Sequence, residues 1–416
     1  MPWRPLGNWG SGWELLGKMD QKHLHPTLAL ERDPSKSTPR EPDPGRSSHH
    51  QNSTLGYSNK TSTTYHYRLP ISSHKRTSPM RSTPTRFLSS INSHLSAATS
   101  NMKLLYPTSL KLDVSQIEGF PSVTLHPYDV KAPIPEEHVD AEILVTWTNS
   151  SHNLKDAVNR LTKLRWIQSL AAGPNDVLSA GFDTSKVAVT TGSGLHDHTV
   201  AEHTLGLLLN AARRFYEMRD YQLQGKWPGH LGGPQPDRPS DRFTTLRDAR
   251  VLIWGFGNIA KTFTPSLVQL GSQVRGVARR QGVRNGIEVY SEDKLAELLP
   301  ETDALVMILP GDPSTRHALN AERLKLLPKH AWVVNVGRGT SIDEDALYDA
   351  LVEERIGGAA LDVFETEPLP EPSRLWKAPN LILSPHAAGG RPQGAEQLIV
   401  ENLRKFLAGQ QLKNLI

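Results

Sequence analysis

Three ionisable residues near the end of the chain stand in contexts that suit acid–base chemistry on an anion. Arg338 lies in NVGRGT, Glu367 in DVFETEP and His386 in SPHAAGG. Each follows a strand-like run, and ligands bind beyond the carboxyl ends of strands in open α/β sheets. Imidazole can exchange a proton near neutral pH, a carboxylate can orient it, and a guanidinium can hold an anion. Taken alone, each residue also fits an ordinary role: a surface ion pair, a cap and a loop histidine, respectively.

A glycine-rich turn upstream predicts a dinucleotide site. Gly255-Phe-Gly257-Asn-Ile-Ala260 follows the strand-like run 250–254 and opens a helical segment. In this fingerprint the first glycine permits a tight turn and the second lets the backbone approach a pyrophosphate, while alanine is allowed at the third position. The helix N-terminus adds free N–H groups and the positive end of the helix dipole. The order of strand, turn, helix and second strand favours this interpretation over a simple tight turn.

The end of the second strand bears on the choice between NAD and NADP. An NAD-specific site places an acidic residue about 20 residues after the glycines, where it holds the ribose 2′-hydroxyl. This chain has Ala278-Arg279-Arg280, and the next acidic residue is Glu288. Guanidinium groups bind a 2′-phosphate that a carboxylate would repel. We therefore expect Arg279 and Arg280 to favour NADP(H); the alternative is that both are ordinary solvated residues.

The elements that must position these residues alternate between strand and helix from Met102 onward, which indicates parallel sheets covered by helices. Before the Gly- and Pro-rich loop 225–241 we expect strands at 103–106, 143–147 and 164–169, and helices at 154–164 and from Val200 to about Tyr221. After it we expect six strands, as in a doubly wound nucleotide-binding domain, at 250–254, 274–278, 304–309, 332–335, 359–362 and 381–383. The predicted fold class is α/β, with two Rossmann-like doubly wound domains. A flavodoxin-like substrate domain, 102–199 plus 387–416, holds an inserted NAD(P)-binding domain, 200–386.

Residues 1–101 differ from the rest in composition. Hydrophobic residues make up only 37% of the 416 residues, which indicates that some segment does not fold. Residues 1–101 carry 13 Lys and Arg against 6 Asp and Glu, whereas the remainder carries 34 against 37. The sequence pI of about 9.1 therefore arises from this segment, and net charge gives no support for nucleic-acid binding by the folded part. We predict a disordered tail.

The tail has two further interpretations. Between Gly45 and Asn101 it has no acidic residue, while Arg and Ser recur, which resembles a mitochondrial transit composition. We favour a solvated tail, or a start codon placed upstream of a natural start at Met102.

Composition also excludes several classes of protein. The chain has no cysteine, which excludes a disulfide scaffold, a thiolate nucleophile and cysteine-ligated metal. No apolar run approaches the roughly 20 residues that span a bilayer, and no secretory signal is evident. We expect a cytoplasmic protein with no metal site and no membrane partner.

At this point the sequence resembles the D-isomer-specific 2-hydroxyacid dehydrogenase family. The resemblance covers about residues 102–416, in order and without large gaps. It is carried by LRWIQSLAAGPND, TGSGLHDHTVAEHTLGLLL, LRDARVLIWGFGNIAKT, DALVMILPGDPSTRH, NVGRGTSIDEDALYDAL, IGGAALDVFETEPLP and LWKAPNLILSPHAAGG.

The resemblance implies a role for each candidate residue. His386 would be the general acid/base, Glu367 its hydrogen-bond partner, and Arg338 the group that binds the carboxylate and carbonyl of a small 2-oxo acid. Ala172 and Gly173 match the loop whose N–H groups help to hold that carboxylate, and Asp362 matches the residue that faces the nicotinamide carboxamide. The remaining cofactor contacts are expected at Gly255, Gly257, Asn258, Ile259, Leu309 and Pro310.

The expected activity is that of a glyoxylate- or hydroxypyruvate-reductase-like enzyme that acts as a homodimer, with the helix after Val200 packing across the interface. Simple burial within the chain would also explain the apolar run 205–209. The loop around Trp147 carries no charge that would identify the substrate's side chain.

Several features leave alternatives open. Arg391-Pro392 replaces a Thr/Ser-containing stretch that is common in the family. Because no regulatory domain follows Ile416, we do not expect the long, amino-acid-regulated form of phosphoglycerate dehydrogenase. Some corepressors use this fold as a dinucleotide-binding scaffold, and a turnover assay would separate that function from an enzyme. Formate-dehydrogenase-like chemistry would normally place Gln at position 367, so Glu367 argues against it.

Overall fold

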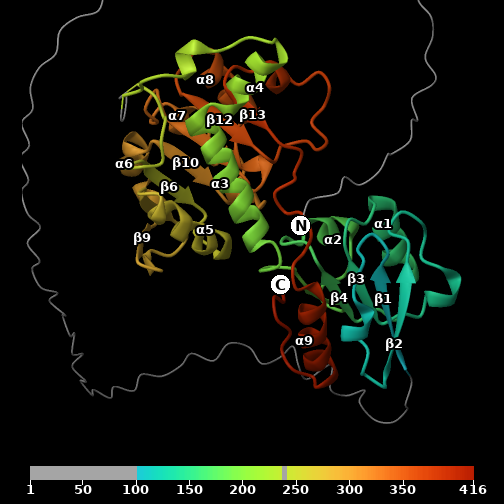
Figure 1. Ribbon diagram of the computed structural model, residues 1–416. Helices are drawn as coiled ribbons and strands as arrows, with labels where there is room; N and C mark the ends of the chain where they lie inside the picture. The colour runs from blue at the N-terminus through green and yellow to red at the C-terminus, as the bar shows by residue number, and fades with distance from the viewer. Residues whose placement is uncertain (1–100, 237–240) are drawn as a thin grey trace, which may run out of the picture. The chain divides into compact units, whose positions relative to one another are not determined.

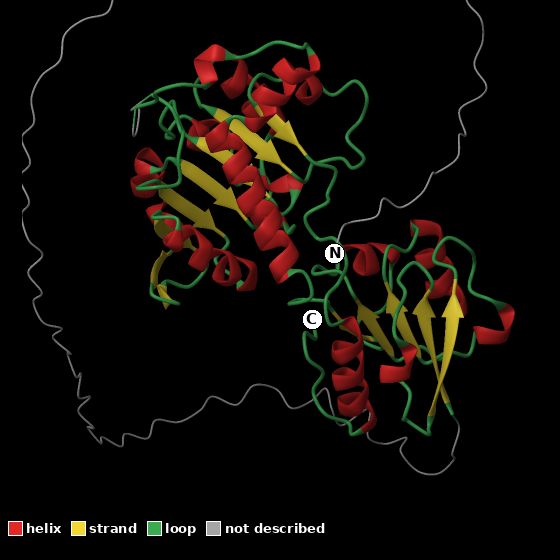
Figure 2. Ribbon diagram, viewed as in Figure 1, coloured by secondary structure: helices red, strands yellow, loops and turns green. Residues whose placement is uncertain are grey.

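The computed structural model describes residues 101–236 and 241–416. The predicted disordered tail therefore lies outside the described residues apart from Asn101, as does the 237–240 part of the loop 225–241. The described residues form two sheets, each covered by helices on both faces (Figures 1 and 2).

The first sheet has five parallel strands, and three helices cover it. They are β1 (Met102–Pro107), β2 (Val123–Tyr128), β3 (Ile143–Thr146), β4 (Trp166–Ser169), β5 (Ala188–Thr190), α1 (Ser151–Arg160), α2 (Asn175–Ala180) and α9 (Ala395–Leu407). The strand order is β2-β1-β3-β4-β5, the flavodoxin-like order. Every residue of β3 and β4 is buried, as parallel strands require when both faces are covered. Helices α1 and α2 cover one face and α9 covers the other.

The second sheet has eight strands and six helices around it. They are β6 (Arg250–Trp254), β7 (Gln273–Val277), β8 (Gly282–Arg284), β9 (Ile287–Tyr290), β10 (Ala304–Met307), β11 (Trp332–Asn335), β12 (Gly358–Leu361), β13 (Leu381–Leu383), α3 (Asp197–Arg213), α4 (Phe215–Leu223), α5 (Asn258–Gln269), α6 (Leu295–Leu298), α7 (Ala321–Leu324) and α8 (Glu344–Val352). The order is β13-β12-β11-β10-β6-β7-β9-β8, and only the β8–β9 pair is antiparallel among the described strands. The doubly wound fold is confirmed, with α3 and α5 on one face and α6, α7 and α8 on the other.

Three details of the predicted elements are wrong. The first sheet contains two strands, β2 and β5, that were not predicted before the loop 225–241. The second sheet has eight strands rather than six, because Gly282–Arg284 and Ile287–Tyr290 form a short hairpin at its edge. The helix predicted from Val200 to about Tyr221 begins at Asp197 and breaks at Arg214, whose φ of 54° is left-handed. The Asn210 side chain accepts the N–H of Tyr216 beyond this break (2.8 Å), so a local polar contact starts a second helix. The apolar run 205–209 is buried or packed against the core within the chain.

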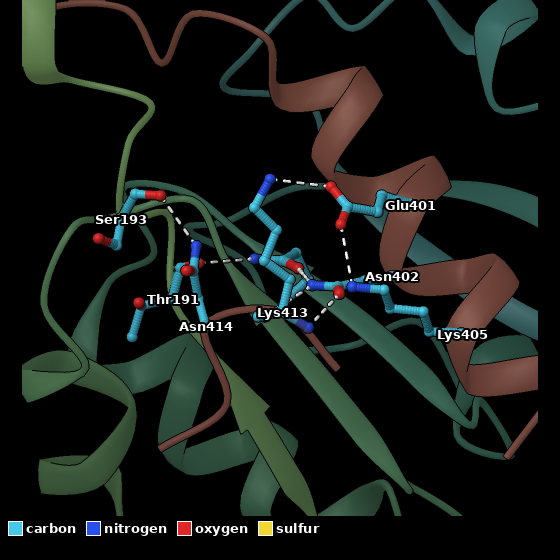
Figure 3. Close-up of polar contacts among 8 residues, drawn as sticks. Thr191, Ser193, Glu401, Asn402, Lys405, Lys413 and Asn414 are labelled. Atoms are coloured by element: carbon cyan, nitrogen blue, oxygen red, sulfur yellow. Dashed lines mark hydrogen bonds and ion pairs between the residues drawn. The ribbon is translucent and has the colours of Figure 1, made fainter. Parts of the chain in front are cut away.

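The C-terminal segment closes the first sheet. After α9, the backbone N–H of Thr191 donates to Asn414 O (3.0 Å), and Asn414 Nδ2 donates to the carbonyls of Thr191 and Ser193 (3.1 and 2.8 Å; Figure 3). Asn402 on α9 donates from Nδ2 to Lys413 O and accepts the Lys413 N–H. The segment after α9 thus returns to bind the first sheet beside its edge strand β5. We retain 102–199 plus 387–416, and 200–386, as the proposed domain boundaries.

Candidate active site

His386 and Glu367 form a hydrogen-bonded pair. His386 Nδ1 lies 2.6 Å from Glu367 Oε2, and Glu367 Oε1 accepts the Phe364 N–H at 2.9 Å. The hydrogen bond to Glu367 raises the pKa of His386 above its ordinary value, although burial acts against this. Burial raises the pKa of Glu367, but the hydrogen bonds from His386 and Phe364 outweigh it, so that pKa is lowered overall. The pair therefore favours an imidazolium beside a carboxylate.

Asp362, at the end of β12, holds the turn that carries His386. Its buried carboxylate accepts hydrogen bonds from the Ser384 hydroxyl (2.6 Å) and from the N–H groups of Ala387 (2.8 Å) and Ala388 (3.0 Å). His386 itself has a left-handed φ of 50°. A non-glycine residue keeps that conformation only where its surroundings enforce it. The predicted contact of Asp362 with a nicotinamide stays a prediction.

Arg338 extends from the turn after β11. Asn335 and Ser341 fix this turn, because Asn335 Nδ2 and the Ser341 hydroxyl both donate to Arg338 O (3.1 and 2.7 Å). The guanidinium donates to Gly337 O at 2.7 Å. Burial lowers the pKa of Arg338, against the effects of Glu367 and Asp176. The group remains a cation available to an anionic ligand.

The substrate loop predicted at Ala172 and Gly173 lies against Arg338. A Cβ atom at Gly173 would be 2.9 Å from Arg338 Nη2, so the backbone of the loop lies directly against the guanidinium. Asn175 Nδ2 also donates to Gly311 O at 3.1 Å, across the gap between the loop and the second sheet. Sequence reasoning missed Asn175, because a lone asparagine after Pro174 reads as a helix cap.

One cleft brings most of these residues together. Its volume is about 1030 Å³. Seven predicted site residues line it, namely Ala172, Gly173, Ile259, Arg338, Asp362, Glu367 and His386. Of the other predicted cofactor residues, Leu309 is buried in the core, whereas Pro310, Arg279 and Arg280 are exposed. The cleft is also lined by residues that sequence reasoning did not single out as site residues, including Trp147, His196, Asp312, Arg316 and Glu365.

The glycine turn has the geometry that a dinucleotide needs. Gly255 has φ of 105°, and a Cβ there would lie 2.3 Å from Ile308 O, so this position requires glycine. A Cβ at Gly257 would meet nothing within 4 Å, which leaves open space beside the N-terminus of α5. No side chain caps that end of the 12-residue helix. These features fit a pyrophosphate, and Gly255, Gly257, Asn258 and Ile259 stay predicted cofactor residues.

A third arginine, missed by the sequence analysis, joins this turn. Arg284, in the β8–β9 hairpin, donates hydrogen bonds to Phe256 O in the glycine turn and to Arg280 O. Arg279 lies near Asp312, whose pKa is lowered chiefly by hydrogen bonds from Ser314, with a smaller effect of the Arg279 charge. Asn285-Gly286, directly after Arg284, is a dipeptide typical of hairpin turns. This turn was not predicted from the sequence, so Arg284 was not predicted either.

The next two findings concern metal ions and membranes. Within residues 101–236 and 241–416, no group of three or more His, Cys, Asp or Glu side chains could hold a metal ion. Nor does this part of the chain contain a helix long and apolar enough to cross a bilayer. Arg391, where the sequence departs from the family, donates to Lys111 O at 2.8 Å.

Comparison with known proteins identifies the family to which the chain belongs. Residues 205–388 match the family described as D-isomer specific 2-hydroxyacid dehydrogenase, NAD binding domain. D-3-phosphoglycerate dehydrogenase of Methanocaldococcus jannaschii is 28% identical over 293 residues, which cover 69% of this chain but only 53% of that relative. Glyoxylate reductase of Thermofilum pendens is 32% identical over 261 residues, covering 58% of this chain and 74% of the relative.

A solved structure agrees with both relatives. The D-isomer specific 2-hydroxyacid dehydrogenase of Xanthobacter autotrophicus, in complex with NADPH and MES, has a TM-score of 0.63 and 27% identity. The match covers 76% of this chain and 98% of that one. Sequence, fold and matched relatives agree: the chain belongs to the D-isomer-specific 2-hydroxyacid dehydrogenase family.

Proposed function

We propose that this protein is a reductase that converts a small 2-oxo acid to its D-2-hydroxy acid, with NADPH as the preferred cofactor. The observation that carries the proposal is the convergence of the His386–Glu367 pair and Arg338 on one cleft. These groups supply a proton donor, its orienting carboxylate and a cation for the substrate carboxylate.

The hydrogen bond at Nδ1 of His386 determines which ring nitrogen can exchange a proton with the substrate. Glu367 occupies Nδ1 of His386, so Nε2 is the nitrogen that serves the substrate. A nicotinamide bound beside the glycine turn would supply the hydride for C2 of the 2-oxo acid. The proton on Nε2 then completes the hydroxyl group, and His386 is left as neutral imidazole. In the reverse direction the neutral ring accepts that proton.

The substrate carboxylate is held by Arg338. A guanidinium forms paired, charge-assisted hydrogen bonds with a carboxylate, and burial strengthens them. The N–H groups of Ala172 and Gly173, close to this guanidinium, are proposed to complete the carboxylate site. We propose that Arg338 also polarises the carbonyl beside that carboxylate.

The cofactor preference rests on Arg279 and Arg280, which are exposed at the end of β7, with the guanidinium of Arg284 beside the glycine turn. A 2′-phosphate would meet three cations in this region. The relative from X. autotrophicus, which was solved with NADPH, is consistent with this choice.

An assay with purified protein tests the proposal. Oxidation of NADPH and NADH is followed with glyoxylate, hydroxypyruvate, pyruvate and bulkier 2-oxo acids, at one fixed ionic strength. We expect turnover with the small acids and a higher kcat/KM for NADPH. No oxidation of either cofactor with any 2-oxo acid would contradict the enzyme proposal and favour a dinucleotide-binding scaffold.

We also propose a cytoplasmic homodimer. Phe215, Leu223 and Trp227, in and just after α4, are 54%, 69% and 93% exposed, which is unusual for large apolar side chains outside an interface. Light scattering tests the dimer: a monomer mass at micromolar concentration would contradict it. Subcellular fractionation tests the location.

A further inference from the structure

The chain passes between the two sheets twice, and the two connecting segments touch. The first, 191–196, leads from β5 into α3, and the second, 384–394, leads from β13 back to α9. The N–H of Gln393 in the second donates to Leu195 O in the first, at 2.8 Å. A change in the distance between the two sheets must therefore change the backbone conformation of these two segments.

A buried histidine lies at this contact. His196 is 5% exposed, and its ring stacks on Trp147, with centroids 5.3 Å apart and an angle of 18° between the planes. Its Nδ1 lies 2.9 Å from Gly389 O and its Nε2 lies 2.8 Å from Leu170 O. The ring thus bridges two backbone segments that are far apart in the sequence.

The two carbonyl groups belong to the two halves of the proposed site. Leu170 directly precedes Ala171, Ala172 and Gly173, the loop proposed to hold the substrate carboxylate. Gly389 ends the turn that begins at His386. The ring therefore spans from the substrate loop to the segment that carries the proton donor.

Both partners of the ring are carbonyl oxygens, which only accept, so the ring donates to both when each nitrogen carries a hydrogen and to one of them, set by the tautomer, when only one does. A hydrocarbon in place of the ring would leave two buried carbonyls without that donor, which is unfavourable. Thr199 adds a second donor to Gly389 O at 2.8 Å but has no bond to Leu170. The bridge to the substrate loop is thus a property of His196.

We propose that His196 is a positioning residue that fixes the distance between the substrate loop 171–173 and the His386 turn. The inference rests on the proposed function, because the spacing matters only if substrate carboxylate and proton donor must be held together. Displacements of about 1 Å can cost roughly 100-fold in rate when reacting groups are aligned by the protein. Both ring nitrogens of His196 face backbone carbonyls, so we expect it to act through those carbonyls rather than by transferring a proton.

The test uses His196→Phe, which keeps an aromatic ring against Trp147 and removes both hydrogen bonds. We expect KM for the 2-oxo acid to rise and kcat to fall, giving a loss of roughly 10- to 100-fold in kcat/KM. The Kd of NADPH, measured by fluorescence without substrate, should stay within about twofold. His196→Gln retains a donor for one carbonyl and should fall between wild type and His196→Phe, which serves if the Phe variant does not fold.

A matched control separates positioning from simple stability. Asp303→Asn removes a buried carboxylate at the opposite edge of the second sheet and should lower Tm without changing kcat or KM of the folded enzyme. Thr199→Val removes the other donor to Gly389 O and should have a smaller effect than His196→Phe. If His196→Phe lowers Tm but keeps wild-type kcat and KM, as Asp303→Asn should, the inference is overturned.

Hydrogen–deuterium exchange gives a readout that needs no turnover. In His196→Phe we expect faster exchange in both 170–173 and 386–390, and unchanged exchange in β10 and β11. Unchanged exchange in either loop would overturn the positioning role. Inactivity of the wild-type enzyme would instead contradict the proposed function, and the exchange result would still decide whether His196 ties the two loops together.

Discussion

In the second sheet an arginine, an acid and a histidine cluster at the amino ends of the strands, and a second set clusters at their carboxyl ends; we call these the amino edge and the carboxyl edge. The two clusters differ in how their side chains are paired. At the amino edge, Asp303 lies at the start of β10 and is 3% exposed. Arg250 reaches it from β6 at 2.8 Å, and His330 reaches it at 2.8 Å from the turn before β11. We call these three residues the amino-edge cluster. Burial alone would raise the pKa of Asp303, but the hydrogen bonds from Arg250 and His330 lower it to about 2.

The carboxyl-edge cluster consists of Arg338, Glu367 and His386. Here the acid binds the histidine and a backbone N–H, and the arginine donates to a backbone carbonyl, Gly337 O. Both the guanidinium and the imidazole line a cleft of about 1030 Å³. The cations of this cluster thus have hydrogen-bonding capacity left for a ligand.

The comparison shows how the proposed site differs from a structural ion cluster built of the same residue types. In the amino-edge cluster the arginine and the histidine both bind the same buried carboxylate, so the three side chains satisfy one another. In the carboxyl-edge cluster the geometry leaves donors directed at a cavity. Perturbed pKa values occur in both clusters, so a shifted pKa does not by itself identify the site.

The largest expected effect separates the two histidines. His386→Ala should lower kcat for reduction by roughly 10²- to 10⁴-fold, because the proton donor is lost, with little change in NADPH binding. His330→Ala should leave kcat unchanged and lower Tm. Steady-state kinetics and thermal unfolding of both variants check this. Comparable losses of kcat in the two variants would remove the distinction between the clusters.

The next effect concerns the pH profile. Glu367 raises the pKa of His386, and reduction requires the protonated ring, so activity is present below that pKa and is lost as pH rises through it. In Glu367→Gln the pKa falls, so activity should be lost at lower pH than in wild type. The kcat at pH 7 should also fall roughly 10- to 100-fold. Measurement of kcat from pH 5 to 9 decides: an unchanged profile would refute the role of Glu367.

The amino-edge cluster should respond to acid through stability. The folded-state pKa of Asp303 is about 2, below its ordinary 3.8. Its stabilising contribution, on the order of 2 kcal/mol, should be complete above about pH 4 and lost as pH falls toward 2. Urea unfolding of wild type and Asp303→Asn at pH 7 and at pH 3 measures this. The difference between the two proteins should shrink at the lower pH; a constant difference would contradict the assigned pKa.

The smallest effect concerns the cofactor. Arg279→Ala should raise KM for NADPH by roughly 10-fold and leave KM for NADH nearly unchanged, since an exposed charge-assisted bond is weakened by solvent and salt. Ala278→Asp should disfavour NADPH further through repulsion. Values of kcat/KM at one ionic strength test both variants. A wild-type enzyme that uses NADH at least as well as NADPH would show that the arginines are solvated surface residues.

The sequence predicted the carboxyl-edge cluster because strand ends are visible in sequence. The runs before Arg338 and His386 are short, apolar and bounded by polar residues, and parallel strands place their carboxyl ends at one edge. The strands at 250–254, 332–335 and 381–383 have the predicted limits. The glycine turn was recognisable from the spacing of Gly255, Gly257 and Ala260 after an apolar run. The structure adds that a Cβ at Gly255 would lie 2.3 Å from Ile308 O.

Other features depend on contacts that sequence patterns do not record. The strands β8 and β9 are short and partly exposed, so they lack the apolar run that marks β6. The break at Arg214 depends on a side-chain contact of Asn210 within an otherwise continuous helical pattern. His196 and Arg284 act on backbone carbonyls distant in sequence, and their partners appear only when the chain is folded.

The central claim is that the carboxyl-edge cluster binds a carbonyl compound through an adjacent carboxylate. The most direct test compares glyoxylate with acetaldehyde, which has the same aldehyde group and no carboxylate, as substrates for NADPH oxidation by the wild-type enzyme. We predict a kcat/KM at least about 100-fold higher for glyoxylate, because only glyoxylate can bind the Arg338 guanidinium through paired charge-assisted hydrogen bonds. Equal kcat/KM values for the two aldehydes would contradict the account.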